Sequence, residues 1–141
     1  MLTPRHIDRV VAAALDEDAP WGDLTSTTLI PAHATATADL VAREPGVFSG
    51  GDVFAAAFRL TDPTVRVSLH VADGTAFSPG DVLASVSGPA RSVLTAERIG
   101  LNFSQRMSGI ATLTQRYVAA VTGTRKRSVS LPSPAGSAAP P

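Results

Sequence analysis

Residues 94–112 read LTAERIGLNFSQRMSGIAT, and this stretch decides how the rest of the chain is organised. It predicts a long helix, because large apolar residues recur at steps of three and four, which is the α-helical repeat. The apolar stripe consists of Ile99, Phe103, Met107, Ile110, Leu113, Tyr117 and Val121. A neighbouring face carries polar or small residues, namely Arg98, Asn102, Gln105, Gly109 and Thr112. This pattern is most typical of a surface helix whose polar face meets water, and it also fits a helix that presents polar groups to a ligand.

The composition limits the classes of protein to which the chain can belong. With 141 residues there is room for one domain and little more. The 12 basic and 12 acidic residues balance, so nothing favours nucleic acid or an anionic membrane as a partner. The absence of cysteine excludes disulfides and thiolate metal sites. No apolar run approaches a membrane span and no signal-peptide pattern is present, so we expect a cytoplasmic protein.

The segments before residue 94 predict a small set of helices and strands. Thr3-Pro4 is a typical helix start. Residues 65–71 alternate apolar and polar side chains as a half-buried strand does, and Asp73-Gly74 marks a hairpin turn before the return strand. In chain order we expect a helix over 1–18, a turn-rich connection over 19–31, strands over 34–43 and at 47–48, a helix over 53–60 with Asp52 as its N-cap, and strands over 65–71 and 82–87.

The predicted fold class is therefore α+β. We expect an N-terminal α/β sandwich, in which a small, mostly antiparallel sheet packs with helices, followed by a long helix and a disordered tail. The corresponding domain division is a sandwich over 1–90, a connecting helix over 91–123 and a low-complexity tail over 124–141, which is rich in serine, proline, alanine and glycine.

Outside the long helix, the sequence predicts no catalytic, cofactor-binding or metal-binding residue. The three histidines, His6, His33 and His70, lie in different predicted elements. The acids at 16–18 are expected to be solvated or to lie beside a basic group, since no further carboxylate or histidine completes a metal site. The Gly50-Gly51 pair suits close backbone packing better than phosphate binding. Residues 71–88 have the hairpin rhythm of biotinyl and lipoyl carrier domains, but Lys126 is the only lysine, which excludes a carrier.

The long helix resembles that of the quinolinate phosphoribosyltransferases, also called nicotinate-nucleotide pyrophosphorylases (carboxylating). The resemblance rests on Thr95–Arg98, Leu101–Phe103 and Ser108–Thr112, and residues 17–31 are similar to the family's N-terminal signature. It implies a small N-terminal α/β sandwich followed by an α/β barrel. It also implies a pentosyltransferase of NAD biosynthesis, which converts quinolinate and phosphoribosyl pyrophosphate into nicotinate mononucleotide, CO₂ and pyrophosphate with Mg²⁺.

The resemblance also implies one substrate-binding residue. Arg98, the arginine of Thr-Ala-Glu-Arg, would bind the quinolinate carboxylate in the active site of the neighbouring subunit of a dimer. A guanidinium suits this task because it binds a carboxylate in a bidentate fork and keeps its charge. Asn102, Ser108 and Thr112 match family positions and are assigned to helix packing, while Glu97 either anchors the helix or is a solvated charge. The family's Mg²⁺ ligands are not expected in this chain.

The resemblance ends near Arg127. The family's Asp-Thr-Arg-Lys-Thr strand would fall at 130–134, where this sequence reads Ser-Leu-Pro-Ser-Pro. We therefore hypothesise a truncated family member that lacks the barrel and has no activity by itself, with a tail that is either translated out of frame or lost from selection. Its exposed apolar stripe would favour a homodimer or association with a full-length subunit. The alternatives are a non-catalytic dimerisation or binding module, or a fragment of the related molybdenum-transport-associated protein.

Overall fold

The computed structural model describes residues 2–18 and 24–123. The predicted disordered tail and the first five residues of the predicted connection, 19–23, therefore lie outside the described residues. In chain order the elements are α1 Pro4–Asp18, α2 Leu24–Leu29, β1 Thr35–Val41, β2 Gly46–Val47, α3 Gly51–Thr61, β3 Arg66–Leu69, β4 Ala76–Phe77, β5 Val82–Pro89 and α4 Ala90–Val121.

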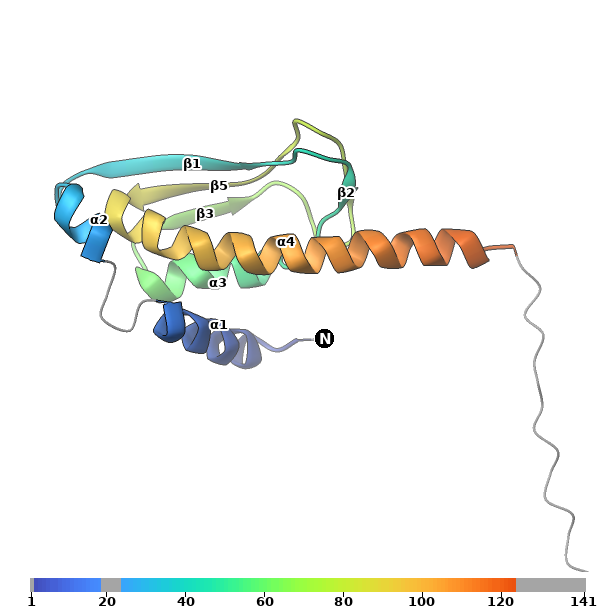
Figure 1. Cartoon of the computed structure of the whole chain (residues 1–141), viewed down its shortest axis with the longest axis horizontal. Coiled ribbons are helices and arrows are strands. Elements are labelled where there is room, and N and C mark those ends of the chain that lie inside the picture. Colours follow the sequence, from blue (N-terminus) through green and yellow to red (C-terminus); the bar gives the residue numbers. More distant parts are fainter. Residues whose placement is uncertain (1, 19–23, 124–141) are drawn as a thin grey trace, which may run out of the picture.

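The fold has three layers (Figure 1). An antiparallel sheet with strand order β1-β5-β3 forms the first layer. Helices α3 and α4 lie side by side beneath one face of this sheet, and α1 packs on α3 from the outside. The opposite sheet face is polar, because Thr37, Asp39 and Ser85 point away from the helices. This arrangement confirms the predicted α+β sandwich, including its mostly antiparallel sheet.

The predicted hairpin after residue 71 is wrong in one respect. β3 and β5 do pair antiparallel, with Val67 opposite Val86, as the return strand required. The Asp73-Gly74 turn, however, leads first into β4, which pairs with β2 in a separate two-stranded sheet. Gly74 adopts a positive φ of 85°, and its N–H donates to the Phe48 carbonyl at 2.7 Å. The chain therefore detours to close the end of the sandwich before it returns to the main sheet.

The core lies between the sheet and the two central helices. Phe54 and Phe58 of α3 are almost fully buried, and their ring centroids are 4.9 Å apart. They pack against small sheet residues and against the start of α4. At Gly100 an added Cβ would lie only 3.1 Å from Phe54 Cδ2 and 3.2 Å from Phe58 Cε2. Glycine at this position lets α4 approach α3 closely enough to bury both rings, each worth about 1.5–3 kcal/mol.

The N-terminus of α3 is capped by a distant residue, so the predicted Asp52 cap is wrong. The helix begins at Gly51, and the N-cap is Gly50 with a φ of 98°. The Asp73 carboxylate accepts the N–H of Gly50 through Oδ2 and that of Gly51 through Oδ1, both at 2.9 Å. A carboxylate at this end satisfies unpaired N–H groups and complements the positive end of the helix dipole.

Asp62 connects the end of α3 to the start of α4. Its Oδ2 accepts a hydrogen bond from Ser92 Oγ at 2.7 Å. Its Oδ1 accepts two from Thr64, from the backbone N–H at 2.9 Å and from Oγ1 at 2.7 Å. These hydrogen bonds, that of Ser92 first, lower the pKa of Asp62 below its ordinary value of 3.8.

We expect Asp62→Asn to lower the Tm by a few degrees at neutral pH, because an amide keeps only one acceptor oxygen. A carboxylate with a lowered folded-state pKa stabilises the fold above its unfolded pKa of 3.8, and this stabilisation is lost as pH falls through the lower folded pKa. The Tm difference between the two proteins should therefore be full at neutral pH and shrink below pH 3.8, which scanning calorimetry measures. Asp16→Asn is the matched control, since Asp16 is exposed, and an equal loss in both variants would contradict the prediction.

Candidate functional site

The two halves of helix α4 differ in how much of their surface the rest of the fold covers. Its first half lies beneath the sheet, whereas its second half continues past β2 (Figure 1). Ile99 is buried and Met107 half-buried, but the predicted apolar stripe is exposed beyond that point. The exposed large side chains of the second half are Ile110, Leu113, Tyr117, Val118 and Val121, each more than half exposed. The stripe is therefore continuous along the helix, yet only its first half belongs to the core.

Two short hydroxyl side chains fasten the middle of α4 to β2 and the segment after it. Thr112 Oγ1 accepts the Val47 N–H at 2.9 Å. Ser108 Oγ accepts the Ser49 N–H at 3.0 Å and donates to the Ser49 carbonyl at 3.2 Å. These contacts confirm the packing role expected of Ser108 and Thr112, although helical spacing alone puts Thr112 on the polar face. The same assignment is wrong for Asn102, which is exposed.

Gly50 lets the backbone pack closely against α4, as the sequence predicted for the Gly50-Gly51 pair. An added Cβ at Gly50 would lie 2.8 Å from Met107 Sδ. Together with the hydroxyl contacts, this close approach determines how α4 sits across the end of the sandwich.

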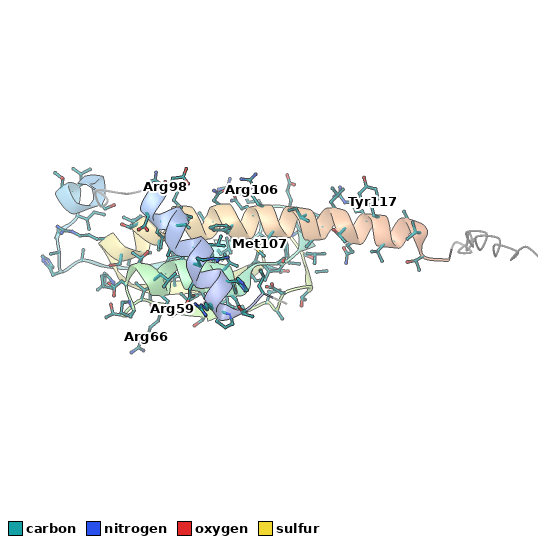
Figure 2. All side chains as sticks on the ribbon, turned by 90° about the horizontal axis from the view of Figure 1, so that it is seen from below. Arg59, Arg66, Arg98, Arg106, Met107 and Tyr117 are labelled. Carbon is teal, nitrogen blue, oxygen red and sulfur yellow. The ribbon has the colours of Figure 1, made fainter. Side chains whose placement is uncertain are left out.

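Arg98 lies on the outer side of α4, as does Arg106 (Figure 2). Its side chain is 69% exposed, and its Nη1 lies 3.4 Å from Oδ1 of Asp18, the last residue of α1. Among the described residues the guanidinium has no other ion-pair partner. The acidic end of α1 thus has a basic neighbour, one of the two situations expected for it. Glu97 is half-buried and forms no ion pair with any described residue, so its role stays a prediction.

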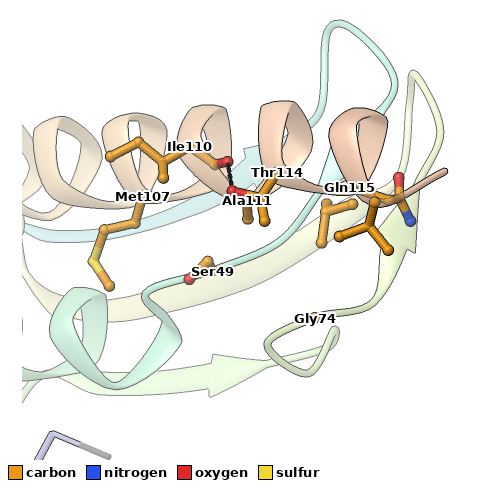
Figure 3. A pocket seen from close by; sticks show the side chains of 9 residues that line it. Ser49, Gly74, Met107, Ile110, Ala111, Thr114 and Gln115 are labelled. Carbon is orange, nitrogen blue, oxygen red and sulfur yellow. Dashed lines mark hydrogen bonds between the residues drawn. The ribbon is translucent and has the colours of Figure 1, made fainter. Parts of the chain in front are cut away.

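An apolar groove of about 580 Å³ opens between the second half of α4 and the β2 end of the sandwich (Figure 3). Residues that line it include Val47, Met107, Ile110, Ala111 and Val118. None of its lining residues is charged. The groove therefore suits an apolar side chain of a partner and not a dicarboxylate substrate.

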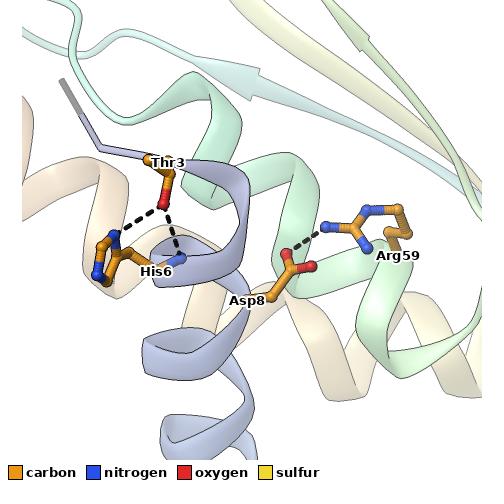
Figure 4. A network of polar contacts seen from close by, with 4 residues as sticks. All are labelled: Thr3, His6, Asp8 and Arg59. Atoms are coloured by element: carbon orange, nitrogen blue, oxygen red, sulfur yellow. Dashed lines mark hydrogen bonds and ion pairs between the residues drawn. The ribbon is translucent and has the colours of Figure 1, made fainter.

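The remaining polar contacts are structural. His6 Nδ1 lies 2.7 Å from Thr3 Oγ1 at the start of α1, and Asp8 pairs with Arg59 to join α1 to α3 (Figure 4). His70 Nε2 lies 2.8 Å from Ser85 Oγ, on the polar face of the sheet. Over residues 2–18 and 24–123, no three histidine or acidic side chains come together as the ligands of a metal cluster do. No helix in the same ranges is long and apolar enough to cross a membrane.

The comparison with known families decides which family this arrangement represents. The model of the family described as quinolinate phosphoribosyl transferase, N-terminal domain, matches residues 23–108. The chain belongs to the quinolinate phosphoribosyl transferase family. The match includes the whole sheet, α3 and the part of α4 that carries Arg98 and Ser108.

Relatives of known name agree with this membership. The chain is 41% identical over 123 residues to the nicotinate-nucleotide pyrophosphorylase [carboxylating] of Mycobacterium leprae, covering 83% of this chain and 42% of that protein. It is 40% identical over 102 residues to the probable enzyme of the same name from Bacillus subtilis, covering 72% of this chain and 35% of that protein. The chain thus spans well under half the length of these quinolinate phosphoribosyl transferase relatives.

Solved structures of the family share this fold. NadC from Streptococcus pyogenes superposes with a TM-score of 0.83 at 38% identity, over 88% of this chain and 44% of that one. The nicotinate-nucleotide pyrophosphorylase from Francisella tularensis superposes with a TM-score of 0.81 at 28% identity, over 87% of this chain and 44% of that one. The described part of the chain therefore corresponds to the N-terminal domain of these proteins and contains none of the family's barrel.

We expect Ser108→Ala to lower the free energy of unfolding by about 1–3 kcal/mol, because it leaves the N–H and carbonyl of Ser49 without their partner. Urea unfolding followed by circular dichroism measures this change. Thr114→Ala is the matched control: its exposed hydroxyl bonds only to the Ile110 carbonyl of its own helix, so a change within about 0.5 kcal/mol is expected. Equal losses in the two variants would contradict the role of Ser108 as a tether.

Proposed function

We propose that this domain serves a nicotinate-nucleotide pyrophosphorylase (carboxylating). This activity transfers the phosphoribosyl group of phosphoribosyl pyrophosphate to quinolinate and yields nicotinate mononucleotide, CO₂ and pyrophosphate. The observation that carries the proposal is the position of Arg98. Its neighbours on α4, Ala96, Ile99 and Gly100, are buried in the core, whereas the Arg98 guanidinium is turned outward and exposed.

The chemistry of Arg98 matches the proposed substrate. Quinolinate carries two carboxylates on a planar ring, and a guanidinium binds a carboxylate through two parallel N–H donors. Because Arg98 projects from the surface of its own domain, we propose that it reaches the active site of a neighbouring subunit and binds a quinolinate carboxylate there. The names of the relatives from Mycobacterium leprae and Bacillus subtilis favour this activity over that of the molybdenum-transport-associated protein.

One arginine does not assemble an active site. Phosphoribosyl transfer needs several preorganised charges around the reacting groups and the leaving pyrophosphate. The described residues offer Arg98 for this purpose and no metal cluster, so we assign no step to Mg²⁺. The other substrate-binding and catalytic groups would belong to a family barrel on the neighbouring subunit.

We propose a second copy of the chain, or a full-length family subunit, as the partner of α4. Ile110, Leu113, Tyr117 and Val121 are each more than half exposed, and Ile110 also lines the apolar groove. A contiguous apolar surface of this kind marks an interaction site in a folded protein. The same surface supports the alternative function, a non-catalytic dimerisation module.

We expect the 141-residue chain by itself to show no phosphoribosyl transfer. Mixed with a full-length relative that lacks its own arginine at the motif position, the chain should restore phosphoribosyl transfer by that relative. The Mycobacterium leprae relative with that arginine changed to alanine is a suitable partner. In the mixed assembly the chain would supply Arg98 to a complete barrel. Release of pyrophosphate from quinolinate and phosphoribosyl pyrophosphate measures the activity.

In the Arg98→Ala chain the restored rate of pyrophosphate release should fall by about a hundredfold or more, since truncation removes the charged hydrogen bonds to the carboxylate. Arg106→Ala is the matched control, because Arg106 is also an exposed arginine of α4 and should leave the restored activity unchanged. Restoration by the Arg98→Ala chain would refute the proposed role, and activity of the unmixed chain would refute the need for a partner.

We also expect Ile110→Glu combined with Tyr117→Glu to weaken self-association at least tenfold, because each change places a charge where an apolar side chain would be buried. Sedimentation velocity over a range of concentrations measures the dissociation constant. Gln105→Glu adds a charge on the polar side of the same helix and should leave association unchanged. A monomeric unsubstituted chain at high concentration would contradict this interface.

A further inference from the structure

We propose that Asp18 is a positioning residue for Arg98. In this proposal Asp18 holds the guanidinium through Nη1 so that the opposite edge, formed by Nε and Nη2, faces outward to bind a carboxylate. The inference rests on the proposed function, since it concerns how Arg98 is prepared for its substrate.

The contact joins two elements that the core holds in place. Asp18 ends α1, and Arg98 lies on the outer side of α4. Ile7 and Val11 of α1 belong to the same buried cluster as Ile99, the residue after Arg98. The Asp18 carboxylate is therefore presented from an anchored helix at a set place beside the guanidinium. Its side chain is only 24% exposed, against 69% for that of Arg98.

The geometry leaves most of the guanidinium available. Asp18 Oδ1 lies 3.4 Å from Nη1, which makes a single long contact and not a bidentate pair. A guanidinium carries five donors in one plane, and no other described residue forms an ion pair with Arg98, so its Nε–Nη2 edge can donate two hydrogen bonds to a second carboxylate. Exposure also keeps the Asp18 contact weak enough for Arg98 to adjust when a ligand binds.

The contact with Arg98 also places a positive charge beside the negatively charged end of α1. Asp16, Glu17 and Asp18 stand at the C-terminus of the helix, where a positive charge is favoured, and α1 has no basic residue in its last turn. Arg98 supplies that charge from α4. One ion pair thus relieves the acidic helix end and restricts the side chain that the proposed function uses.

The test compares Asp18→Asn, Asp18→Glu and the control Asp16→Asn in the 141-residue chain. The first measurement is the ¹⁵N relaxation of the Arg98 Nε–H group. We expect its order parameter to fall in Asp18→Asn, to stay unchanged in Asp16→Asn and to recover in Asp18→Glu. An Arg98 side chain equally ordered in all four proteins would overturn the inference, whatever the outcome for the proposed function.

The second measurement uses the mixed assembly with the arginine-deficient relative. We expect Asp18→Asn to raise the KM for quinolinate about twofold to fivefold with kcat unchanged, the range that an exposed ion pair supports. The difference should narrow at ~1 M salt, where screening weakens the ion pair in the unsubstituted chain. A contact that only stabilised the fold would change the Tm and leave the KM alone.

The outcomes separate the two proposals. If Arg98→Ala abolishes restoration and Asp18→Asn leaves the KM unchanged or lowers it, Arg98 binds substrate and Asp18 does not position it. If Arg98→Ala restores activity as well as the unsubstituted chain, the proposed role of Arg98 fails. The substrate-directed part of the inference then fails with it, and the relaxation data report only on the ion pair.

Discussion

The close approach of α4 to α3 at Gly100 is the contact on which the rest of the structure depends. No side chain separates the α4 backbone from the rings of Phe54 and Phe58 there, and an added Cβ would lie 3.1 Å from the nearer ring. This contact also orients the polar face of the helix. Positions 98 and 100 lie about 200° apart around a helix, so burying Gly100 turns Arg98 outward. The packing of two aromatic rings thus determines that Arg98 faces away from the core.

Short polar side chains complete what the apolar core begins. Ser108 and Thr112 bond to backbone groups at and beside β2, where the main sheet no longer covers α4. The helix therefore stays attached to the sandwich while its second half continues beyond it with an exposed apolar surface. One helix then carries both an outward cation and an exposed apolar surface in a set geometry. The proposed function uses both features, because both would engage the neighbouring subunit together.

Much of the fold could be predicted from local patterns. Helical spacing predicted α4, alternation predicted β3, the turn signals predicted its antiparallel return strand β5, and Thr3-Pro4 predicted the start of α1. The errors share a physical cause, which is that the deciding contact comes from a distant segment. Asp73 caps α3 in place of Asp52, although it lies 22 residues from Gly51 in the chain. The β4 detour likewise depends on pairing with β2, which the turn residues alone do not indicate.

The sequence by itself determined the family, the α+β class and Arg98 as the candidate substrate-binding residue, because motif identity and hydrophobic period are properties of neighbouring residues. Only the tertiary structure decided how far the apolar stripe is buried, that Asn102 is exposed while Thr112 packs inward, and that Asp18 stands beside Arg98. Helical spacing assigns residues to faces, but it does not say where the sheet that covers a face comes to an end. Nor does it say which distant carboxylate meets an arginine, since that depends on how α1, α3 and α4 pack together.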